Sequence, residues 1–429
     1  MKQAHNEDFQ KLSPKQQQAI ELFNQGQNLF ISGGAGSGKS HLLQFFKRYF
    51  SQLGMEITAS TGVSAINVGG STIHSFSGIG LGNLPLEQSI ENIMLAKMSR
   101  VRRKIRQTNI LAIDEISMIS SSTLDLIDQV FREVRENNKP MGGMQIIFFG
   151  DFLQLPPISR YNENFDFCFN SSTFKELDLQ VIILDKIFRQ DDANFIKILQ
   201  DLRFGKISPE SRIALESRLN ADDDNTLIRP TILTTHNAKV EKINHDFLKK
   251  IPQEEIVHHA KFDGNAFKIE FFKKNCLASE TLRLRVGAQV MMIKNTYQKE
   301  GIINGSLGIV KGFSSKKNYP IVQFTNFREL TISPEEWLLE RFDNDTKTVI
   351  AEAKMTQIPL ILAWAMTIHK SQGLTLDKIS CDLKDSFSHG QAYVALSRAR
   401  SLSGINIESI DFNKISADPQ AVEFFSKYC

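Results

Sequence analysis

The sequence has little of what marks a secreted, disulfide-bonded or membrane protein. Its 429 residues include four cysteines, none in a Cys-x-x-Cys pair. A disulfide framework and a zinc site are therefore disfavoured, and we expect the cytoplasm, or the nucleoid in a bacterium. No apolar run approaches the ~20 residues of a membrane-spanning helix. The polar first eleven residues, with Glu7 and Asp8, do not resemble a targeting peptide.

A strong charge of one sign is also missing. The formal net charge is +3, so composition neither demands nor excludes a polyanionic partner, because local patches matter more than the sum. Apolar residues make up 41% of the chain, which is enough for sizeable cores. The length is that of about three domains.

One motif is present in full, the pattern G-x-x-x-x-G-K-[ST]. An apolar, β-prone segment (28–32) precedes it and a segment with helical apolar spacing (41–50) follows, which is the context that a phosphate-binding loop requires. The glycines let backbone N–H groups point at a polyphosphate. Lys39 would contact the β- and γ-phosphates and the Ser40 hydroxyl would ligate Mg²⁺, which predicts an ATP site. The loop consists of Gly33, Gly34, Ala35, Gly36, Ser37, Gly38, Lys39 and Ser40.

Two carboxylates follow a second apolar segment. Asp114 and Glu115 come directly after residues 109–113, which are too apolar for an edge strand. We therefore expect both at the sheet edge that carries Lys39. Asp114 would hold the metal ion, directly or through water, and Glu115 would orient or deprotonate the attacking water.

Three further residues are candidates with open alternatives. Gln16 lies on a helix that Ser13-Pro14 predicts; it could contact adenine, but an exposed helical glutamine is an equally good interpretation. Gln154 follows the apolar segment 144–151 and could sense the γ-phosphate, although an isolated glutamine in a proline turn would mean little. Arg189, near the start of a second domain, is a candidate arginine finger or an ordinary surface arginine.

The remaining pattern predicts a mostly parallel first sheet and a second βα unit without a phosphate loop. Between residues 251 and 353, short β-prone runs alternate with turns, and Asn304-Gly305 is a hairpin signal. This predicts a small β-barrel inserted into the second unit. The α/β pattern returns at Ile358, with a helix expected over residues 366–373.

Polar side chains stand where several predicted strands end. Such groups can hold a nucleic-acid backbone without reading its sequence. For the histidines among them, packing or capping is the alternative. The candidates are Thr61, Thr72, His74, His236, Asn237, Asn295, Thr367, His369 and Lys370.

The ordered set of motifs resembles the Pif (petite integration frequency) family of DNA helicases, in superfamily one and close to RecD-type enzymes. The resemblance covers most of the chain, from Leu12 to Arg400. It rests on residues 12–16, the Lys39 loop, 59–76, 113–119, 150–157, 188–190, 287–292, 367–377 and 393–400.

The resemblance implies an α/β fold with two RecA-like domains. The first would span residues 1–185, with a small wedge insertion at about 77–100. The second would comprise 186–250 and 354–429, with the β-rich, barrel-like insertion at 251–353. It also implies that Gln16 contacts adenine, that Gln154, Arg189 and Arg398 approach the γ-phosphate, that Gly373 belongs to the nucleotide site and that Gly62 joins the DNA contacts.

The activity implied is Mg²⁺-ATP hydrolysis that drives 5′-to-3′ movement on single-stranded DNA and duplex unwinding. G-quadruplexes and RNA–DNA hybrids are further possible substrates, and replication, recombination, repair and telomere maintenance are the implied processes. We expect single-stranded, forked or structured DNA as partners, no membrane, and a monomer that can associate on DNA. The alternatives are an ATP-regulated DNA clamp or annealing factor without unwinding, and a protein-remodelling NTPase.

Overall fold

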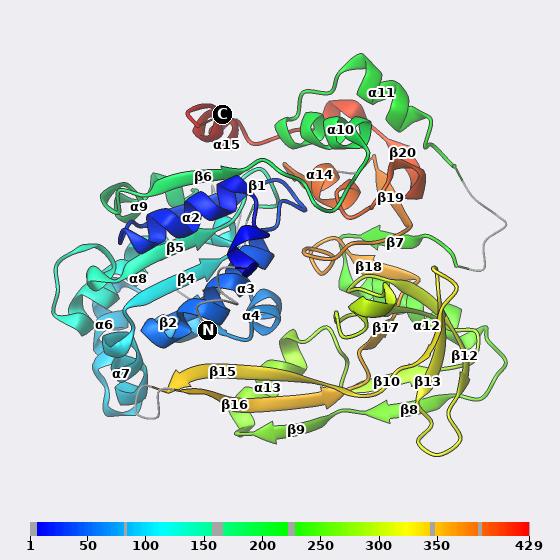
Figure 1. Ribbon diagram of the computed structural model, residues 1–429, viewed down its shortest axis with the longest axis horizontal. Helices are drawn as coiled ribbons and strands as arrows, with labels where there is room; N and C mark the ends of the chain where they lie inside the picture. The colour runs from blue at the N-terminus through cyan, green and yellow to red at the C-terminus, as the bar shows by residue number, and fades with distance from the viewer. Residues whose placement is uncertain are drawn as a thin grey trace. The chain divides into compact units, whose positions relative to one another are not determined.

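The computed structural model describes residues 7–80, 84–156, 166–221, 228–343, 348–384 and 388–428. Pro157, the final residue of the 150–157 motif, lies outside these residues. The chain divides into two compact units (Figure 1). The first unit comprises Met1–Lys186, Leu338–Glu352 and Glu423–Cys429, and the second comprises Ile187–Trp337 and Ala353–Val422.

A six-stranded parallel sheet forms the centre of the first unit. Its strand order is β3-β2-β4-β5-β1-β6. Strands β1 and β4 are buried at every position, as expected for a parallel sheet covered on both faces. The strands are β1 (Leu29–Gly33), β2 (Met55–Ala59), β3 (Ser71–Thr72), β4 (Ile110–Asp114), β5 (Gln145–Phe149) and β6 (Gln180–Leu184).

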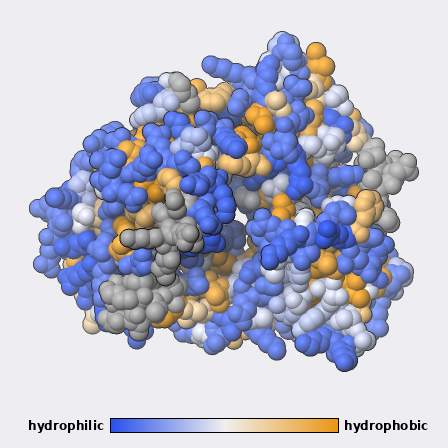
Figure 2. Space-filling model, viewed as in Figure 1, coloured by the Kyte–Doolittle hydropathy of each residue, from blue (hydrophilic) through white to orange (hydrophobic). Residues whose placement is uncertain are grey.

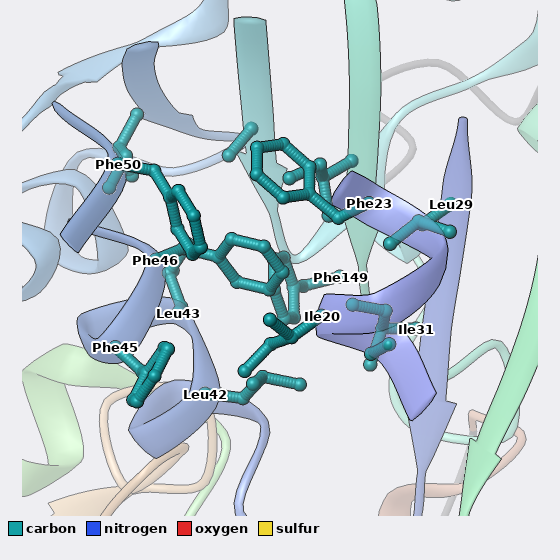
Figure 3. Packing of buried hydrophobic residues seen from close by; sticks show 14 of the residues in the cluster. Ile20, Phe23, Leu29, Ile31, Leu42, Leu43, Phe45, Phe46, Phe50 and Phe149 are labelled. Atoms are coloured by element: carbon teal, nitrogen blue, oxygen red, sulfur yellow. The ribbon is translucent and has the colours of Figure 1, made fainter. Parts of the chain in front are cut away.

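Helix α2 (Pro14–Asn24) precedes the first strand of this sheet, and the other helices of the unit follow strands. They are α3 (Lys39–Phe50), α4 (Gly62–Val68), α5 (Ile73–Ser77), α6 (Leu86–Met94), α7 (Ser99–Gln107), α8 (Ser121–Arg135) and α9 (Ser172–Glu176). Figure 3 shows one core cluster, in which side chains of α2, α3, β1 and β5 interdigitate. Phe23 and Phe46 meet there edge to face, with ring centroids 5.0 Å apart.

Helix α15 (Pro419–Ser426) contributes aromatic side chains to the first unit. The Phe424 ring stacks on Phe169, with centroids 4.7 Å apart, and contacts Phe152 at 5.4 Å. Phe425 is completely buried. Residues distant in sequence from the first sheet thus complete part of its core.

The second unit contains a four-stranded parallel sheet of order β18-β7-β19-β20. Its strands are β7 (Thr231–Thr234), β18 (Ala365–Thr367), β19 (Ile379–Leu383) and β20 (Ile405–Ile410). The accompanying helices are α10 (Ala193–Phe204), α11 (Pro209–Glu216), α12 (Asn237–Lys249) and α14 (Gln391–Leu396).

The helix expected over residues 366–373 was wrong. Strand β18 ends at Thr367, and turns follow. Hydroxyl groups compete here with helical hydrogen bonds: Thr367 Oγ1 accepts from the Lys370 N–H, and Ser371 Oγ donates to the Ile368 carbonyl at 2.7 Å.

An antiparallel sheet of order β14-β13-β12-β11-β17 forms the β-rich part. Two expectations fail here. Asn304-Gly305 is no two-residue hairpin but lies in the long connection 293–306 between β11 and β12, and β17 joins this sheet instead of restarting the α/β pattern. The strands are β11 (Gln289–Met292), β12 (Leu307–Phe313), β13 (Pro320–Phe324), β14 (Glu329–Thr331) and β17 (Leu360–Leu362).

The other strands form two further sheets. Strands β8 (Ile256–His259) and β10 (Thr281–Leu284) form a pair, and β9 (Lys261–Gly264), β15 (Glu335–Asp343) and β16 (Thr348–Gln357) form a three-stranded sheet beside α13 (Ala266–Asn275). Within the described ranges, every helix is too short or too polar to cross a membrane. The face visible in Figure 2 is largely hydrophilic, with scattered hydrophobic residues.

Candidate active site

The loop between β1 and α3 has a backbone that only glycine accommodates well. Gly36 and Gly38 have φ angles of 81° and 87°, in the left-handed region that side chains disfavour. At Gly33, a Cβ atom would lie 2.6 Å from Ser37 Oγ and 2.7 Å from the Leu184 carbonyl oxygen. The backbone of the loop at Gly33 is therefore packed tightly against the end of β6.

Polar groups line this loop as a phosphate site requires. Lys39 Nζ donates to the Gly33 carbonyl at 2.6 Å and to the Gly34 carbonyl at 3.2 Å, which holds the ammonium group over the loop. Ser40, the next residue of α3, is exposed. Ser37 Oγ is buried without a hydrogen-bond partner among the described residues. A polyphosphate oxygen would satisfy this group, so the loop fits the predicted ligand.

Gln16 is 1% exposed, so its interpretation as an exposed helical glutamine was wrong. Its side-chain oxygen accepts from the Ser13 N–H at 2.9 Å, which completes a capping box at the start of α2. Its amide nitrogen donates to the Gly38 carbonyl at 3.3 Å. Gln16 thus ties α2 to the loop.

Asp114 and Glu115 stand at the carboxyl end of β4. Asp114 is 9% exposed, and its Oδ1 accepts from the Glu115 N–H at 3.0 Å. Burial, and then the charge of Glu115, raise the pKa of Asp114 to about 7, while Lys39 acts in the opposite direction. Glu115 has φ 52°, a left-handed backbone that costs a non-glycine residue about 1–3 kcal/mol. Such stored strain is common at functional sites.

The described residues contain no cluster of three His, Cys, Asp or Glu side chains that could hold a metal alone. A magnesium ion at Asp114 and Ser40 would therefore need oxygens from a nucleotide or water. This is how Mg²⁺ is usually held in ATP-binding proteins.

Gln154 is buried beside Asp151, a residue that the sequence argument did not single out. The Gln154 amide donates to Asp151 Oδ2 at 3.3 Å, and its backbone N–H donates to the Asp151 carbonyl at 3.0 Å. Asp151 is completely buried. The available signal was a carboxylate two residues after the apolar strand β5, close to the sheet edge where β4 ends with Asp114.

In the second unit, Arg189 and Arg398 lie close together. Arg189 donates from Nε to Thr375 Oγ1 at 3.0 Å and from Nη1 to the Ser397 carbonyl at 2.9 Å. Arg398 is 2% exposed and donates to the Val394 carbonyl and the Ser397 hydroxyl. Burial, followed by the charge of Arg398, lowers the pKa of Arg189 to about 9. Two distant motifs thus form one cationic pair.

The DNA-contact candidates of the first unit follow β2 and β3. Thr61 and Thr72 are the N-caps of α4 and α5, where their hydroxyls accept from the backbone of Ser64 and Ser75. Gly62 opens α4, and His74 lies on α5 with a pKa lowered by burial. These threonines therefore have capping roles, and a neutral imidazole is favoured at His74.

The candidates of the second unit follow β7 and β18, which are parallel neighbours with Thr367 beside Thr234. His236 and Asn237 are exposed at the start of α12, and Lys370 is exposed after β18. Thr367 is 3% exposed, and burial lowers the pKa of His369. Asn295 is exposed in the connection 293–306, while Gly373 has φ 79° in the turns after β18.

Comparison with known proteins identifies relatives along the whole chain. The PIF1-like helicase family matches residues 11–212, and the 2B domain of DNA helicase Pif1 matches residues 269–313. The human ATP-dependent DNA helicase PIF1 is 38% identical over 97% of this chain and 64% of its own length. The Pif1 helicase of Bdellovibrio bacteriovorus is 34% identical over 97% of this chain and 92% of its own length.

A solved structure agrees with these matches. Unliganded Pif1 from Bacteroides sp. is 33% identical, covers 97% of both chains and superposes with a TM-score of 0.84. The chain thus spans less than two thirds of the human relative (64%) but nearly all of these two bacterial ones. It belongs to the PIF1-like helicase family, with the α/β, RecA-like fold of that family.

Proposed function

We propose that this chain is an ATP-dependent DNA helicase that moves 5′ to 3′ on single-stranded DNA and separates duplexes. The observation that carries the proposal is the glycine-rich loop, in which Lys39 donates to the Gly33 carbonyl, together with the buried Asp114 at the end of β4. Support also comes from Bacteroides Pif1, which has been solved with ADP-AlF4 and with single-stranded DNA.

The first unit would bind the nucleotide. The loop backbone and Lys39 would hold the phosphates, Ser40 and Asp114 would hold Mg²⁺, and Gln16 would lie beside the adenine. Bound Mg²⁺ would supply positive charge that neutralises the phosphates. The buried, partnerless Ser37 hydroxyl supports this assignment, because it is suited to a phosphate oxygen.

Glu115 would act on water. Asp114 is the more buried carboxylate, and its raised pKa makes it a poor free anion until a cation binds. Glu115 is only partly buried, which suits a group that orients or deprotonates the attacking water. Gln154, fixed by Asp151, would report the state of the γ-phosphate to its loop.

Arg189 and Arg398 would supply positive charge to the phosphates during hydrolysis, with Gly373 near the nucleotide. An arginine in this role is worth on the order of 10³–10⁵ in rate. Support comes from the repulsion between the two positive charges, which lie close together in a buried environment. An anion would relieve that repulsion.

DNA would be held through its backbone by side chains of both units, without sequence readout. The strand ends of both parallel sheets carry these groups. The proposed contacts are Thr61, Gly62, Thr72, His74, His236, Asn237, Asn295, Thr367, His369 and Lys370.

The finer features are also proposals. G-quadruplexes and RNA–DNA hybrids would be additional substrates, the chain would be a cytoplasmic monomer that can associate on DNA, and replication, recombination, repair or telomere maintenance would be its processes. The domains would be 1–185 with a wedge at about 77–100, 186–250 with 354–429, and the β-rich insertion 251–353. A solved structure of DNA unwinding at forked double-stranded DNA by two coordinating Pif1 helicases supports association.

The test compares 5′-tailed and 3′-tailed duplexes with ATP and Mg²⁺. We expect separation of the 5′-tailed duplex only, and none with a non-hydrolysable analogue. Lys39→Ala should abolish hydrolysis and unwinding. If DNA stimulates hydrolysis while no strand is displaced, the chain is a clamp or annealing factor instead.

A further inference from the structure

The Thr375 hydroxyl accepts a hydrogen bond from Arg189. Arg189 uses Nε for Thr375 and Nη1 for the Ser397 carbonyl. The third nitrogen of its guanidinium group is Nη2. Two fixed nitrogens orient a planar guanidinium group, so the Thr375 hydroxyl helps to decide where Nη2 points.

The Thr375 backbone is pressed against a turn of the β-rich sheet. A Cβ atom at Gly305 would lie 1.9 Å from the Thr375 carbonyl oxygen and 2.8 Å from its carbonyl carbon. The Gly305 N–H donates to the Met292 carbonyl at 2.8 Å, which fixes the turn to the end of β11. Glycine is required here because the two backbones touch.

A second contact joins the same sheet to the same loop. Thr325 Oγ1, after β13, donates to Asp377 Oδ2 at 2.8 Å. Between these two contacts, Leu376 exchanges backbone hydrogen bonds with the segment of Arg398: its N–H donates to the Arg398 carbonyl, and its carbonyl accepts from Arg400. Residues 375–377 therefore connect the β-rich sheet to both arginines.

The turn is also linked to a proposed DNA contact. Asn295 Oδ1 accepts from the Asn304 N–H at 2.8 Å. The side-chain oxygen of Asn304 is buried without a hydrogen-bond partner in the described part of the chain. The path from exposed Asn295 to Arg189 thus consists of two hydrogen bonds and one backbone contact.

We propose that Thr375 is a positioning residue for Arg189, and that the turn Ile303–Ser306 together with Thr325 is a brace that sets residues 375–377 and couples Asn295 to the arginine. This inference rests on the proposed function and deepens it. A DNA strand that displaces Asn295 would shift the brace and with it the guanidinium group. Thr375 itself touches no reacting atom in this scheme.

The first test replaces Thr375 and measures DNA-stimulated ATP hydrolysis. Thr375→Val keeps the shape but loses the hydroxyl, so we expect kcat to fall about 10- to 100-fold, with KM for ATP changed by less than about twofold. Thr375→Ser should restore kcat. In the background of Arg189→Ala, Thr375→Val should have no further effect, because the group it positions is gone.

A matched control is Thr231→Val, which removes a buried hydroxyl bonded to the Ala363 carbonyl in the same unit. It should lower the melting temperature without a selective loss of kcat. Its effect on the free energy of unfolding should add to that of Arg189→Ala.

The second test addresses the brace. Gly305→Ala places a Cβ against the Thr375 carbonyl, whereas Gly301→Ala has a comparable positive φ (78°) and only a side-chain atom at 3.4 Å. We expect a loss of kcat and of DNA stimulation in the first variant alone. If Gly305→Ala does not fold, Thr325→Val gives the milder perturbation, with the same expected direction.

Each of the following outcomes would overturn one part of the proposal. Wild-type kcat in Thr375→Val, or full additivity with Arg189→Ala, overturns the positioning role. Equal effects of Gly305→Ala and Gly301→Ala, or wild-type behaviour of Thr325→Val where it replaces Gly305→Ala, overturn the brace. A wild-type chain without DNA-stimulated hydrolysis would instead refute the proposed function, and the two failures are therefore distinguishable.

Discussion

Arg189 and Arg398 are anchored on one residue, Ser397. Arg189 donates to its carbonyl oxygen at 2.9 Å, and Arg398 donates to its hydroxyl at 2.7 Å. The two arginines are more than two hundred positions apart in the sequence, and yet both guanidinium groups donate to the same residue. Such a pair is costly without an anion, since each charge disfavours the other.

The first prediction concerns this pair. Arg189→Ala should lower the kcat of ATP hydrolysis by about 10³ or more with a much smaller effect on ATP affinity, measured by steady-state kinetics and nucleotide titration. Arg218 is a matched control, because it too donates to carbonyls of the second unit, those of Ile405 and Ser403. An equal loss of kcat in Arg218→Ala would mean that the effect is structural.

Asp114 predicts an unusual dependence of stability on pH. Burial first, and Glu115 second, raise its pKa from 3.8 to about 7. Between these values the folded chain binds more protons than the unfolded chain, so stability from this group is present at low pH and lost as pH rises towards 7. Without nucleotide and Mg²⁺, Asp114→Asn should therefore be more stable at pH 8, on the order of 1–4 kcal/mol.

The measurement is thermal or denaturant unfolding at pH 4.5 and pH 8, and the gain in stability should be much smaller at the lower pH, where Asp114 of the folded chain is protonated. Asp382 provides the contrast, because hydrogen bonds led by that from Ser409 lower its pKa. Asp382→Asn should give no gain at pH 8. A melting temperature of Asp114→Asn at or below wild type at pH 8 contradicts the prediction.

The loop predicts a difference between two glycines. Gly33→Ala would drive a Cβ into Ser37 Oγ and the Leu184 carbonyl, and should abolish nucleotide binding. Gly26 has φ 79°, and a Cβ atom added there would have no neighbour within 4 Å, so Gly26→Ala should cost about 1 kcal/mol of stability and leave binding intact. Nucleotide titration by fluorescence or calorimetry compares the two variants. Normal nucleotide binding in Gly33→Ala would show that the tight packing at Gly33 is not needed for the site.

Lys370 predicts a change in salt dependence. If this exposed ammonium group neutralises one phosphate, Lys370→Ala should reduce the slope of log affinity against log salt by about 0.7 for single-stranded DNA. The loss should be similar for different sequences. Lys427, also exposed but outside the proposed contacts, is the control. If the salt-dependence slope of Lys370→Ala is unchanged, Lys370 does not contact a DNA phosphate.

The aromatic contacts of α15 predict a large stability effect. Phe425→Ala removes a completely buried ring and should cost about 3–5 kcal/mol. Phe327, at 85% exposed, is the matched control, and its replacement by Ala should stay within about 0.5 kcal/mol. Denaturant titration of both variants is the measurement, and equal midpoints would show that α15 contributes little to the first unit.

The parts of the site that lie in short contiguous stretches could be predicted from sequence. The Lys39 loop, Asp114 and Glu115 are recognisable because strand, loop and helix follow each other within a few residues. Thr375 could not be predicted, because its bond to Arg189 joins positions 186 residues apart. Asp151 had a local signal, the end of an apolar strand, and was overlooked.

The errors in the fold share a physical cause. Residues 360–362 are apolar and β-prone in either sheet, and only their pairing with β11 decides between them. Residues 366–373 do not form the expected helix, because the hydroxyl groups of Thr367 and Ser371 form hydrogen bonds with nearby backbone groups. In both cases tertiary pairing or side-chain competition outweighed the local pattern.

The contribution of α15 to the first unit has a consequence for how the protein is made. Phe30 and Phe152 contact Phe424, so their packing is incomplete until residues 423–428 have left the ribosome. The second unit ends before those residues. During synthesis, the first unit would thus begin to fold first but complete its core last. A fragment that ends at Lys186 would expose aromatic side chains and would be prone to aggregate.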